Sequence, residues 1–172
     1  MKKTTLKLNK GDYIVHAAHG IGKVRGTDIK TLRGTKRTYY QVKTNDLTYW
    51  LPVENSSSER VRMVCAPSTF RKALGAIREK PEILSNNFRV RVSRIKEVLA
   101  KCSLSANTRL LRDLNARHAI KDLHINELRV LDRLKNQFTS EFAVACSIEL
   151  KEAEARLEDA LLEGLSKLPK GK

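Results

Sequence analysis

Cysteine and histidine are the residue types that most often carry nucleophilic or metal chemistry, and the chain has three of the first and four of the second. Cys65, Cys102 and Cys146 are far apart in the sequence, and none belongs to a CxxC pair. His16 and His19 lie three residues apart, but an isolated HxxH pair is weak evidence for a metal site. We therefore expect reduced thiols, no bound metal and no cofactor.

The sequence contains no familiar catalytic motif. It has no GxxxxGK[ST] phosphate loop, no GxGxxG turn, no HExxH helix and no GxSxG elbow. Cys65 and His19 could act as nucleophile and base, but no spacing signal brings them together. We expect a protein that is not an enzyme and has no catalytic residues. An enzyme built on an unrecognised thiol is an alternative, which a fully active Cys65→Ser variant would exclude.

The segment 85–94 has the residue types that bind phosphate. It begins with serine and asparagine, which favour the start of a helix, and then places Arg89, Arg91 and Arg94 on that helix. Backbone N–H groups at a helix N-terminus and arginine side chains together suit a DNA backbone. Phe88 stands at the mouth of this helix, where its ring could press against a base step. Spacing alone favours burial of Phe88 in a helical core, so both interpretations stay open.

The net charge of +15 favours a polyanionic partner, because lysine and arginine release condensed counterions from phosphates. Nucleic acid is the preferred interpretation, with acidic membranes and acidic proteins as alternatives. No apolar run approaches the roughly 20 residues that span a bilayer. The N-terminal MKKTTLKLNKGD lacks the apolar segment of a secretory signal. We expect a cytoplasmic protein with no membrane contact.

The elements that must position these residues change character near residue 67. Before it, short alternating stretches rich in β-branched and aromatic residues are typical of strands separated by turns. The expected strands cover residues 12–16, 22–28, 38–43, 47–53 and 62–64. Such short strands in about 60 residues predict a small Tudor- or SH3-like β barrel, because closure of the sheet hides its edges.

The chain's one tryptophan lies in the expected strand 47–53. Alternate side chains of a strand share a face, so Leu47, Tyr49 and Leu51 are expected to face the core and Trp50 the other side. Large aromatic side chains are enriched at binding hot spots, which makes Trp50 a candidate contact residue. Packing of Trp50 under a loop or against the helical half is an equally weighted alternative.

After residue 67 the apolar residues recur at helical spacing, beginning with Phe70, Leu74 and Ile77. The expected breaks between helices lie at residue 81, at residues 103–105 and at residues 124–126. We therefore expect an α+β protein. Its β-barrel domain would cover residues 1–66 and an all-α helical bundle domain would cover residues 67–172.

Four stretches of the sequence together resemble the CarD/CdnL family of bacterial transcription regulators, and the resemblance covers almost the whole chain. They are KGDYIVHAAHGIGKV (10–24), RGTKRTYYQVK (33–43), DLTYWLPVEN (46–55) and LLRDLNARHAIKDLHINELRVLDRL (110–134). No single motif is strongly specific, but their order and spacing are. The same β domain occurs in transcription-repair coupling factors, from which the helical half and the lack of an ATPase motif separate this chain.

The resemblance implies a Tudor-like domain that binds the RNA polymerase β subunit. The positions that match the family's polymerase contacts are Lys30 and Trp50, with Arg33 nearby. The helical domain would contact promoter DNA at the upstream edge of the transcription bubble through the segment 85–94, and would stabilise the open complex. The family often has arginine at the position of Trp50 and tryptophan at the position of Phe88. Phe88 can still wedge against a base, but it lacks an indole N–H donor.

The expected partners are thus the RNA polymerase β subunit and promoter DNA, with the protein a monomer that has no small-molecule substrate. An alternative from another class is a stand-alone basic nucleic-acid-binding scaffold with no polymerase contact. Co-purification with core polymerase that is lost on changing Trp50 or Lys30 would separate the two.

Overall fold

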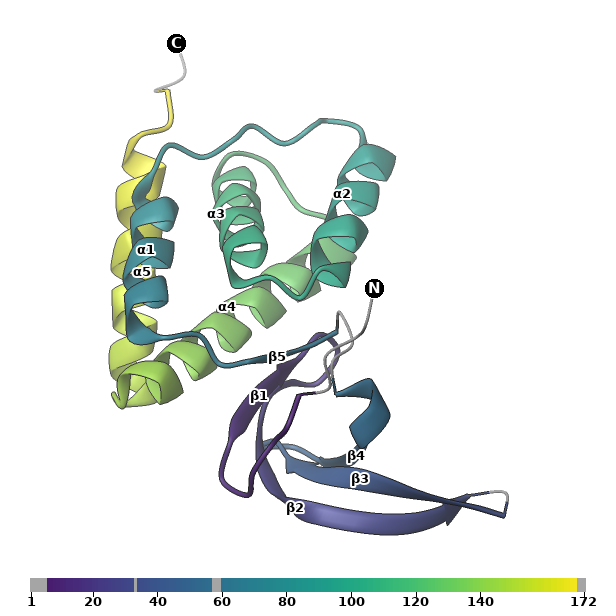
Figure 1. Cartoon of the computed structure of the whole chain (residues 1–172). Coiled ribbons are helices and arrows are strands. Elements are labelled where there is room, and N and C mark those ends of the chain that lie inside the picture. The colour runs from purple at the N-terminus through teal and green to yellow at the C-terminus, as the bar shows by residue number, and fades with distance from the viewer. Residues whose placement is uncertain (1–5, 33, 57–59, 170–172) are drawn as a thin grey trace. The chain divides into compact units, whose positions relative to one another are not determined.

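The computed structural model describes residues 6–32, 34–56 and 60–169, and the chain folds as two compact units (Figure 1). Met1–Val64 form the first, called here the β unit, and Cys65–Lys172 form the second, called the helical unit. An antiparallel sheet makes up the β unit and five helices make up the helical unit, which is an α+β organisation. Each unit has a hydrophobic core of its own.

The sheet of the β unit has the strand order β4-β3-β2-β1-β5, and every neighbouring pair is antiparallel. The strands are β1 (Tyr13–His16), β2 (Gly20–Leu32), β3 (Thr35–Lys43), β4 (Thr48–Pro52) and β5 (Val61–Met63), with a 3-10 turn η1 (Val53–Asn55) after β4. The β2–β3 pair extends from Lys23 opposite Lys43 to Leu32 opposite Thr35, interrupted by one bulge between Val24 and Gly26. Both strands are therefore longer than the alternating pattern indicated.

Within the described residues the sheet is open. β4 and β5 are its two edges, and β5 has three residues, all of which pair with β1. No strand pairing joins β5 to β4 among these residues, so the closed Tudor- or SH3-like barrel expected from the sequence is not confirmed.

One face of the sheet covers the core of the β unit. The buried side chains of this core are Leu8, Ile14, Val24, Tyr40, Val42, Leu51 and Val61. The N-terminal segment is attached to the core through Tyr40, whose hydroxyl accepts the N–H of Leu8 at 3.3 Å and donates to the carbonyl of Leu6 at 3.4 Å. A buried tyrosine hydroxyl with both partners incurs little desolvation penalty. The opposite face of β2, β3 and β4 carries exposed side chains, Arg37 and Trp50 among them.

The helical unit contains α1 (Pro67–Arg78), α2 (Phe88–Ala100), α3 (Leu104–Ile120), α4 (Ile125–Cys146) and α5 (Leu150–Ser166). The expected breaks are confirmed: the first falls at Pro81, and the other two are N-caps. Ser103 caps α3 by accepting the N–H of Ala106 at 3.4 Å, and His124 caps α4. None of the described helices combines the length and the apolar character that crossing a membrane requires.

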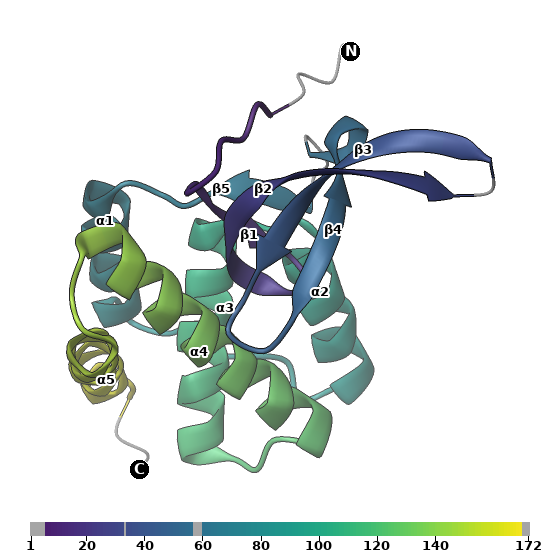
Figure 2. The ribbon, with the colours of Figure 1, turned by 90° about the horizontal axis from the view of Figure 1, so that it is seen from below.

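Aromatic and close backbone packing join α1, α4 and α5 of the helical unit, and α5 is seen almost end-on in Figure 2. The ring of Phe70 on α1 lies 5.5 Å from Phe138 and 5.4 Å from Phe142, both on α4. On α5, a Cβ atom at Gly164 would lie 2.5 Å from the carbonyl oxygen of Ile77. Only glycine allows α5 to approach α1 so closely.

Candidate functional site

Lys30 on β2 and Trp50 on β4 come together on the outer face of the β unit. The Nζ atom of Lys30 lies 3.2 Å from the centroid of the Trp50 ring. Trp50 is 40% exposed, so its ring is available to a partner while the ammonium group covers part of it. Such a cation–π contact at an exposed site contributes about 0.5–1 kcal/mol. Arg33, the third expected polymerase contact, lies outside the described residues.

The strand register identifies what else shares this face. Trp50 pairs with Gln41, and Lys30 pairs with Arg37, which is also exposed. Cross-strand partners point to the same side of a sheet, and residues 37 and 41 of β3 are an even number of positions apart. These four residues give the face one aromatic ring, one amide and two cations, next to the exposed carboxylate of Asp28, two positions from Lys30 on β2. Such a mixed surface suits a polar protein partner.

The alternation predicted for strand 47–53 is confirmed at three of its positions. Leu51 is buried, Tyr49 is half-buried, and Trp50 is exposed on the other face. Leu47 is exposed instead of facing the core, because β4 begins only at Thr48 and the preceding turn uses the Leu47 backbone to bond Thr44.

A cluster of three rings, not anticipated from the sequence, lies around Tyr49. The His19 ring is 4.6 Å and the His16 ring 5.6 Å from that of Tyr49. Burial raises the pKa of Tyr49 to about 12, and its hydroxyl has no hydrogen-bond partner among the described residues. A phenol with so high a pKa cannot serve as a base near neutral pH, so we interpret this cluster as packing.

In the helical unit, the expected DNA-binding segment lies at the start of α2. Asn87 caps the helix by accepting the N–H of Arg89 at 2.9 Å. Phe88 is the first helical residue and is 39% exposed, so it is not a core residue as its spacing alone suggested. Arg89 is exposed next to it. This helix end therefore offers free N–H groups, one arginine and one ring to a ligand.

Arg91, which was expected to bind DNA together with Arg89 and Arg94, is buried instead. Arg91 is 6% exposed, and it forms a two-point ion pair with Glu127 on α4. Its Nε atom lies 2.6 Å from Oε1 and its Nη2 atom 3.0 Å from Oε2 of Glu127, while Nη1 donates to the carbonyls of Ser85 and Asn86 at 2.9 Å each. Every nitrogen of the guanidinium is used inside the unit, so Arg91 positions the start of α2 instead of presenting a free charge.

Arg94 is also held by carboxylates inside the helical unit, but only in part. Its Nη2 atom donates to Glu82 Oε2 at 2.8 Å and to Asp113 Oδ2 at 3.1 Å, although the side chain is 39% exposed. Asp113 is fully buried and also accepts the N–H of Glu82 and the Nε–H of Arg112. Burial raises the pKa of Asp113, and the hydrogen bond from Arg112 opposes that shift. These bonds fix the loop that leads into α2.

The Phe88 ring has a neighbour that sequence reasoning missed. The His124 ring lies 4.8 Å from it at an interplanar angle of 52°, and both side chains are exposed. His124 is the N-cap of α4, and its backbone N–H donates to Glu127 Oε2 at 3.0 Å. The spacing of a capping box, with glutamate three residues after the cap, was a signal that could have identified Glu127 as a structural residue.

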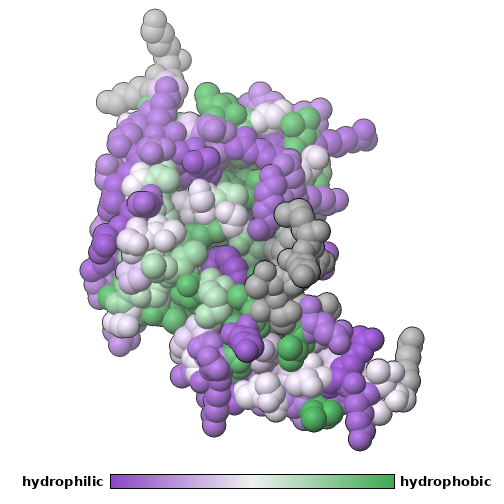
Figure 3. All heavy atoms as spheres, viewed as in Figure 1, coloured by the Kyte–Doolittle hydropathy of each residue, from purple (hydrophilic) through white to green (hydrophobic). Residues whose placement is uncertain are grey.

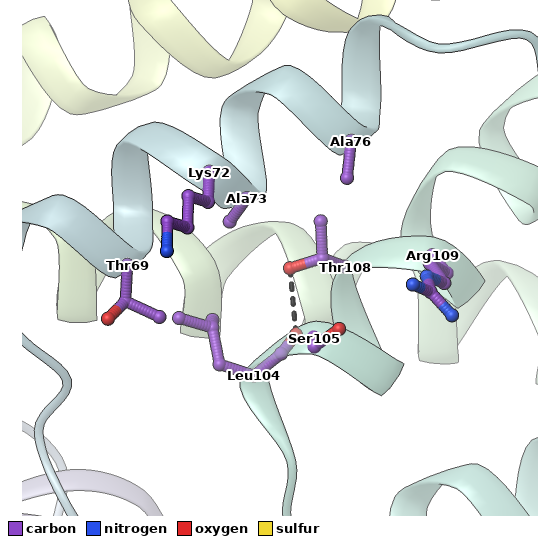
Figure 4. A pocket seen from close by; sticks show the side chains of 8 residues that line it. All are labelled: Thr69, Lys72, Ala73, Ala76, Leu104, Ser105, Thr108 and Arg109. Atoms are coloured by element: carbon purple, nitrogen blue, oxygen red, sulfur yellow. Dashed lines mark hydrogen bonds between the residues drawn. The ribbon is translucent and has the colours of Figure 1, made fainter.

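A pocket of about 250 Å³ lies between α1 and α3 (Figure 4). Its lining consists of Thr69, Lys72, Ala73, Ala76, Leu104, Ser105, Thr108 and Arg109. The Thr108 hydroxyl is already used, because it donates to the Leu104 carbonyl at 2.7 Å. The lining contains no cysteine, histidine or carboxylate. Nor do three or more metal-ligating side chains gather anywhere in residues 6–32, 34–56 and 60–169.

On the face of the helical unit seen in Figure 3, polar residues surround a broad area of less polar and apolar residues. The β unit thus has an exposed aromatic–cation face, and the helical unit has an exposed ring at the start of α2. Residues 8–65 match the family model described as the CarD-like/TRCF RID domain, and residues 72–158 match the model of the CarD C-terminal domain.

The chain therefore belongs to the CarD/CdnL family, which confirms the resemblance seen in the sequence. These domains are those of regulators that interact with RNA polymerase. The match to the C-terminal model resolves the ambiguity of the β domain, because the first model alone is shared with transcription-repair coupling factors.

Proposed function

We propose that the chain binds the RNA polymerase β subunit through the outer face of the β unit and binds promoter DNA through the start of α2, as a monomer. The DNA contact lies at the upstream edge of the melted segment, and the two contacts together stabilise the open complex. The observation that carries this proposal is the exposed Phe88 ring beside Arg89 at a helix N-terminus, in a chain of net charge +15 that belongs to the CarD/CdnL family.

The polymerase contact is assigned to Trp50, Lys30 and Arg33. Trp50 offers a large ring with few rotatable bonds, the kind of side chain that dominates interface energetics. Lys30 lies over that ring, so the ring and the charge reach a partner as one group. Residues 8–65 match a family domain that interacts with polymerase, which supports this face as the docking surface.

The DNA contact is assigned first to Phe88 and Arg89. An apolar ring at an exposed helix start can press against an unstacked base, and the neighbouring arginine can bind the adjoining phosphate. Arg94 can contribute only the part of its guanidinium that Glu82 and Asp113 leave open. Arg91 acts indirectly, by holding the helix start in place.

The mechanism follows from linkage. A factor that binds the open complex more tightly than the closed complex shifts their equilibrium by the ratio of the two affinities and no further. A weak DNA contact is sufficient for this, because attachment to polymerase raises the effective concentration of the helical unit at the promoter.

The experiment that tests the polymerase contact measures binding of the full chain to core RNA polymerase. Trp50→Ala should weaken binding about tenfold, the effect of losing a hot-spot side chain. Lys30→Ala should weaken it less. Ile29→Ala is the matched control, because Ile29 is an exposed apolar side chain of β2 that faces the opposite side from Lys30. If the unchanged chain binds DNA but not polymerase, the protein is a stand-alone nucleic-acid scaffold and this proposal is wrong.

A further inference from the structure

His124 is an unusual residue at the position it occupies. Helix N-caps are preferably serine, threonine, aspartate or asparagine, whose short side chains reach the first free N–H groups. Here the Nδ1 atom of His124 caps α4 by accepting the N–H of Asn126 at 3.2 Å. A smaller side chain would cap α4 equally well, so capping alone does not require the ring of His124.

The cap bond determines which nitrogen of the ring is free. Because Nδ1 accepts a hydrogen bond, the proton of the neutral imidazole is on Nε2. Among the residues that the structure describes, none accepts a hydrogen bond from Nε2, and the side chain is exposed. The ring therefore presents one oriented N–H donor to the solvent, held in place by the first turn of α4.

That donor lies beside the ring proposed to contact DNA. The Phe88 and His124 rings are 4.8 Å apart between centroids and inclined by 52°, so they form one continuous aromatic surface. The Phe88 ring supplies apolar contact surface but has no polar group. His124 supplies a second ring and the missing donor.

The two rings are fixed relative to each other by a shared carboxylate. Glu127 accepts hydrogen bonds from the Arg91 guanidinium on α2 and from the backbone N–H of His124 at the start of α4. Arg91 in turn binds the Ser85 and Asn86 carbonyls that precede Phe88. This network joins the starts of both helices, so the aromatic pair is preorganised before any ligand arrives.

We propose that Phe88 and His124 form a single nucleic-acid contact, in which the Phe88 ring packs on an exposed base and His124 Nε2 donates a hydrogen bond to an acceptor of the same DNA step. This inference rests on the proposed function, because it requires that the start of α2 meets DNA. The inference adds His124, from the start of α4, as a contact residue. The DNA contact then has a polar part as well as an apolar one.

The test measures affinity of the full chain for a fluorescent DNA duplex with a melted, unpaired segment. Phe88→Ala should weaken binding about tenfold, in the range for loss of one base–aromatic stack. His124→Asn keeps a cap acceptor near the position of Nδ1 but removes the ring and Nε2, and it should weaken binding three- to tenfold. Because the two side chains make one contact, the double variant should lose clearly less than the product of the two single losses.

Two controls separate the contact from stability and from general charge. The melting temperature of the His124→Asn and His124→Ser variants should match that of the unchanged protein, because asparagine and serine are both good N-caps. His118→Asn alters another exposed histidine, near the end of α3, and should leave DNA affinity unchanged.

The outcomes distinguish this inference from the proposed function. If Phe88→Ala weakens DNA binding and both His124 variants bind as tightly as the unchanged chain, the inference is overturned while the proposed DNA contact stands. If neither position matters, both fail. Equal losses in the His118 and His124 variants, or strictly multiplicative losses in the double variant, would also overturn the paired contact.

Discussion

Arg91 and Glu127 form a two-point ion pair inside the helical unit, with Nε–Oε1 and Nη2–Oε2 distances of 2.6 and 3.0 Å. The pair exposes 6% of one side chain and 1% of the other. It connects α2 to α4 one helical turn after the exposed Phe88. The binding end of α2 is therefore built on a buried electrostatic contact.

Arg91→Ala should lower the free energy of unfolding of the helical unit by about 3–5 kcal/mol, because it leaves the Glu127 carboxylate buried without its partner. Chemical denaturation at neutral pH, followed by circular dichroism at the helix signal, measures this loss. Arg89→Ala is the control, since Arg89 is exposed and its removal should change stability by no more than about 0.5 kcal/mol. Equal stability of the two variants would contradict the assigned role of Arg91.

The same pair predicts a pH dependence. The hydrogen bonds from Arg91 lower the pKa of Glu127, although burial opposes the shift. A carboxylate whose pKa is lower in the folded state contributes stability that is fully present above its unfolded pKa, about 4.3 for glutamate. That contribution is lost as the pH falls through this value toward the lower folded-state pKa.

Glu127→Gln isolates this effect from the other carboxylates. The difference in unfolding free energy between the unchanged chain and the variant should be largest at pH 7 and shrink toward pH 3. A difference that stays constant across this range would show that ionisation of Glu127 does not stabilise the fold.

Gly164→Ala should destabilise the helical unit by about 1–3 kcal/mol, because the added methyl group would lie 2.5 Å from the Ile77 carbonyl oxygen. Gly75→Ala is the matched control within α1: its Cβ would meet no atom within 4 Å, and it should stabilise the helix by about 0.5–1 kcal/mol. Thermal unfolding of both variants measures the two opposite shifts. A tolerated Gly164→Ala would mean that α1 and α5 pack less closely than described.

Salt dependence tests the assignment of Arg89 to a phosphate. Arg89→Ala should weaken binding of the full chain to DNA and reduce the slope of log affinity against log salt by about 1. Arg156→Ala removes an exposed arginine of α5 that pairs with Glu152, and it should leave the slope unchanged. An unaltered slope in Arg89→Ala would place this side chain away from the DNA backbone.

Much of the fold could be predicted because it follows from local periodicity. The short alternating stretches became strands, and the 3.6-residue spacing of apolar residues became helices that end at the expected breaks. Closure of the sheet is a long-range property that alternation does not encode, and the described sheet is open. The prediction that Leu47 faces the core was wrong for a local reason. The turn ahead of β4 includes Leu47, so this residue is not part of the strand.

The site was harder to predict, because the type of a residue and the side of the helix on which it lies gave opposite indications. Arg91 looks like a phosphate ligand by type, yet it lies four residues before the buried Ile95, on the inward side of α2. Its partner Glu127 is 36 residues away, beyond what spacing can show. Trp50 was predictable because a strand has only two faces, and its contact with Lys30 then needed the actual strand register.

The lifetime of open promoter complexes formed by RNA polymerase, with and without the full chain, tests the central claim most directly. We expect the unchanged protein to lengthen this lifetime, Phe88→Ala to lose most of the effect while still binding polymerase, and Trp50→Ala to lose the effect until its concentration is raised. Leu162→Ala, which removes an exposed apolar side chain of α5, should act like the unchanged protein. An unchanged lifetime with the intact chain bound to polymerase, or full activity of Phe88→Ala, would contradict the account.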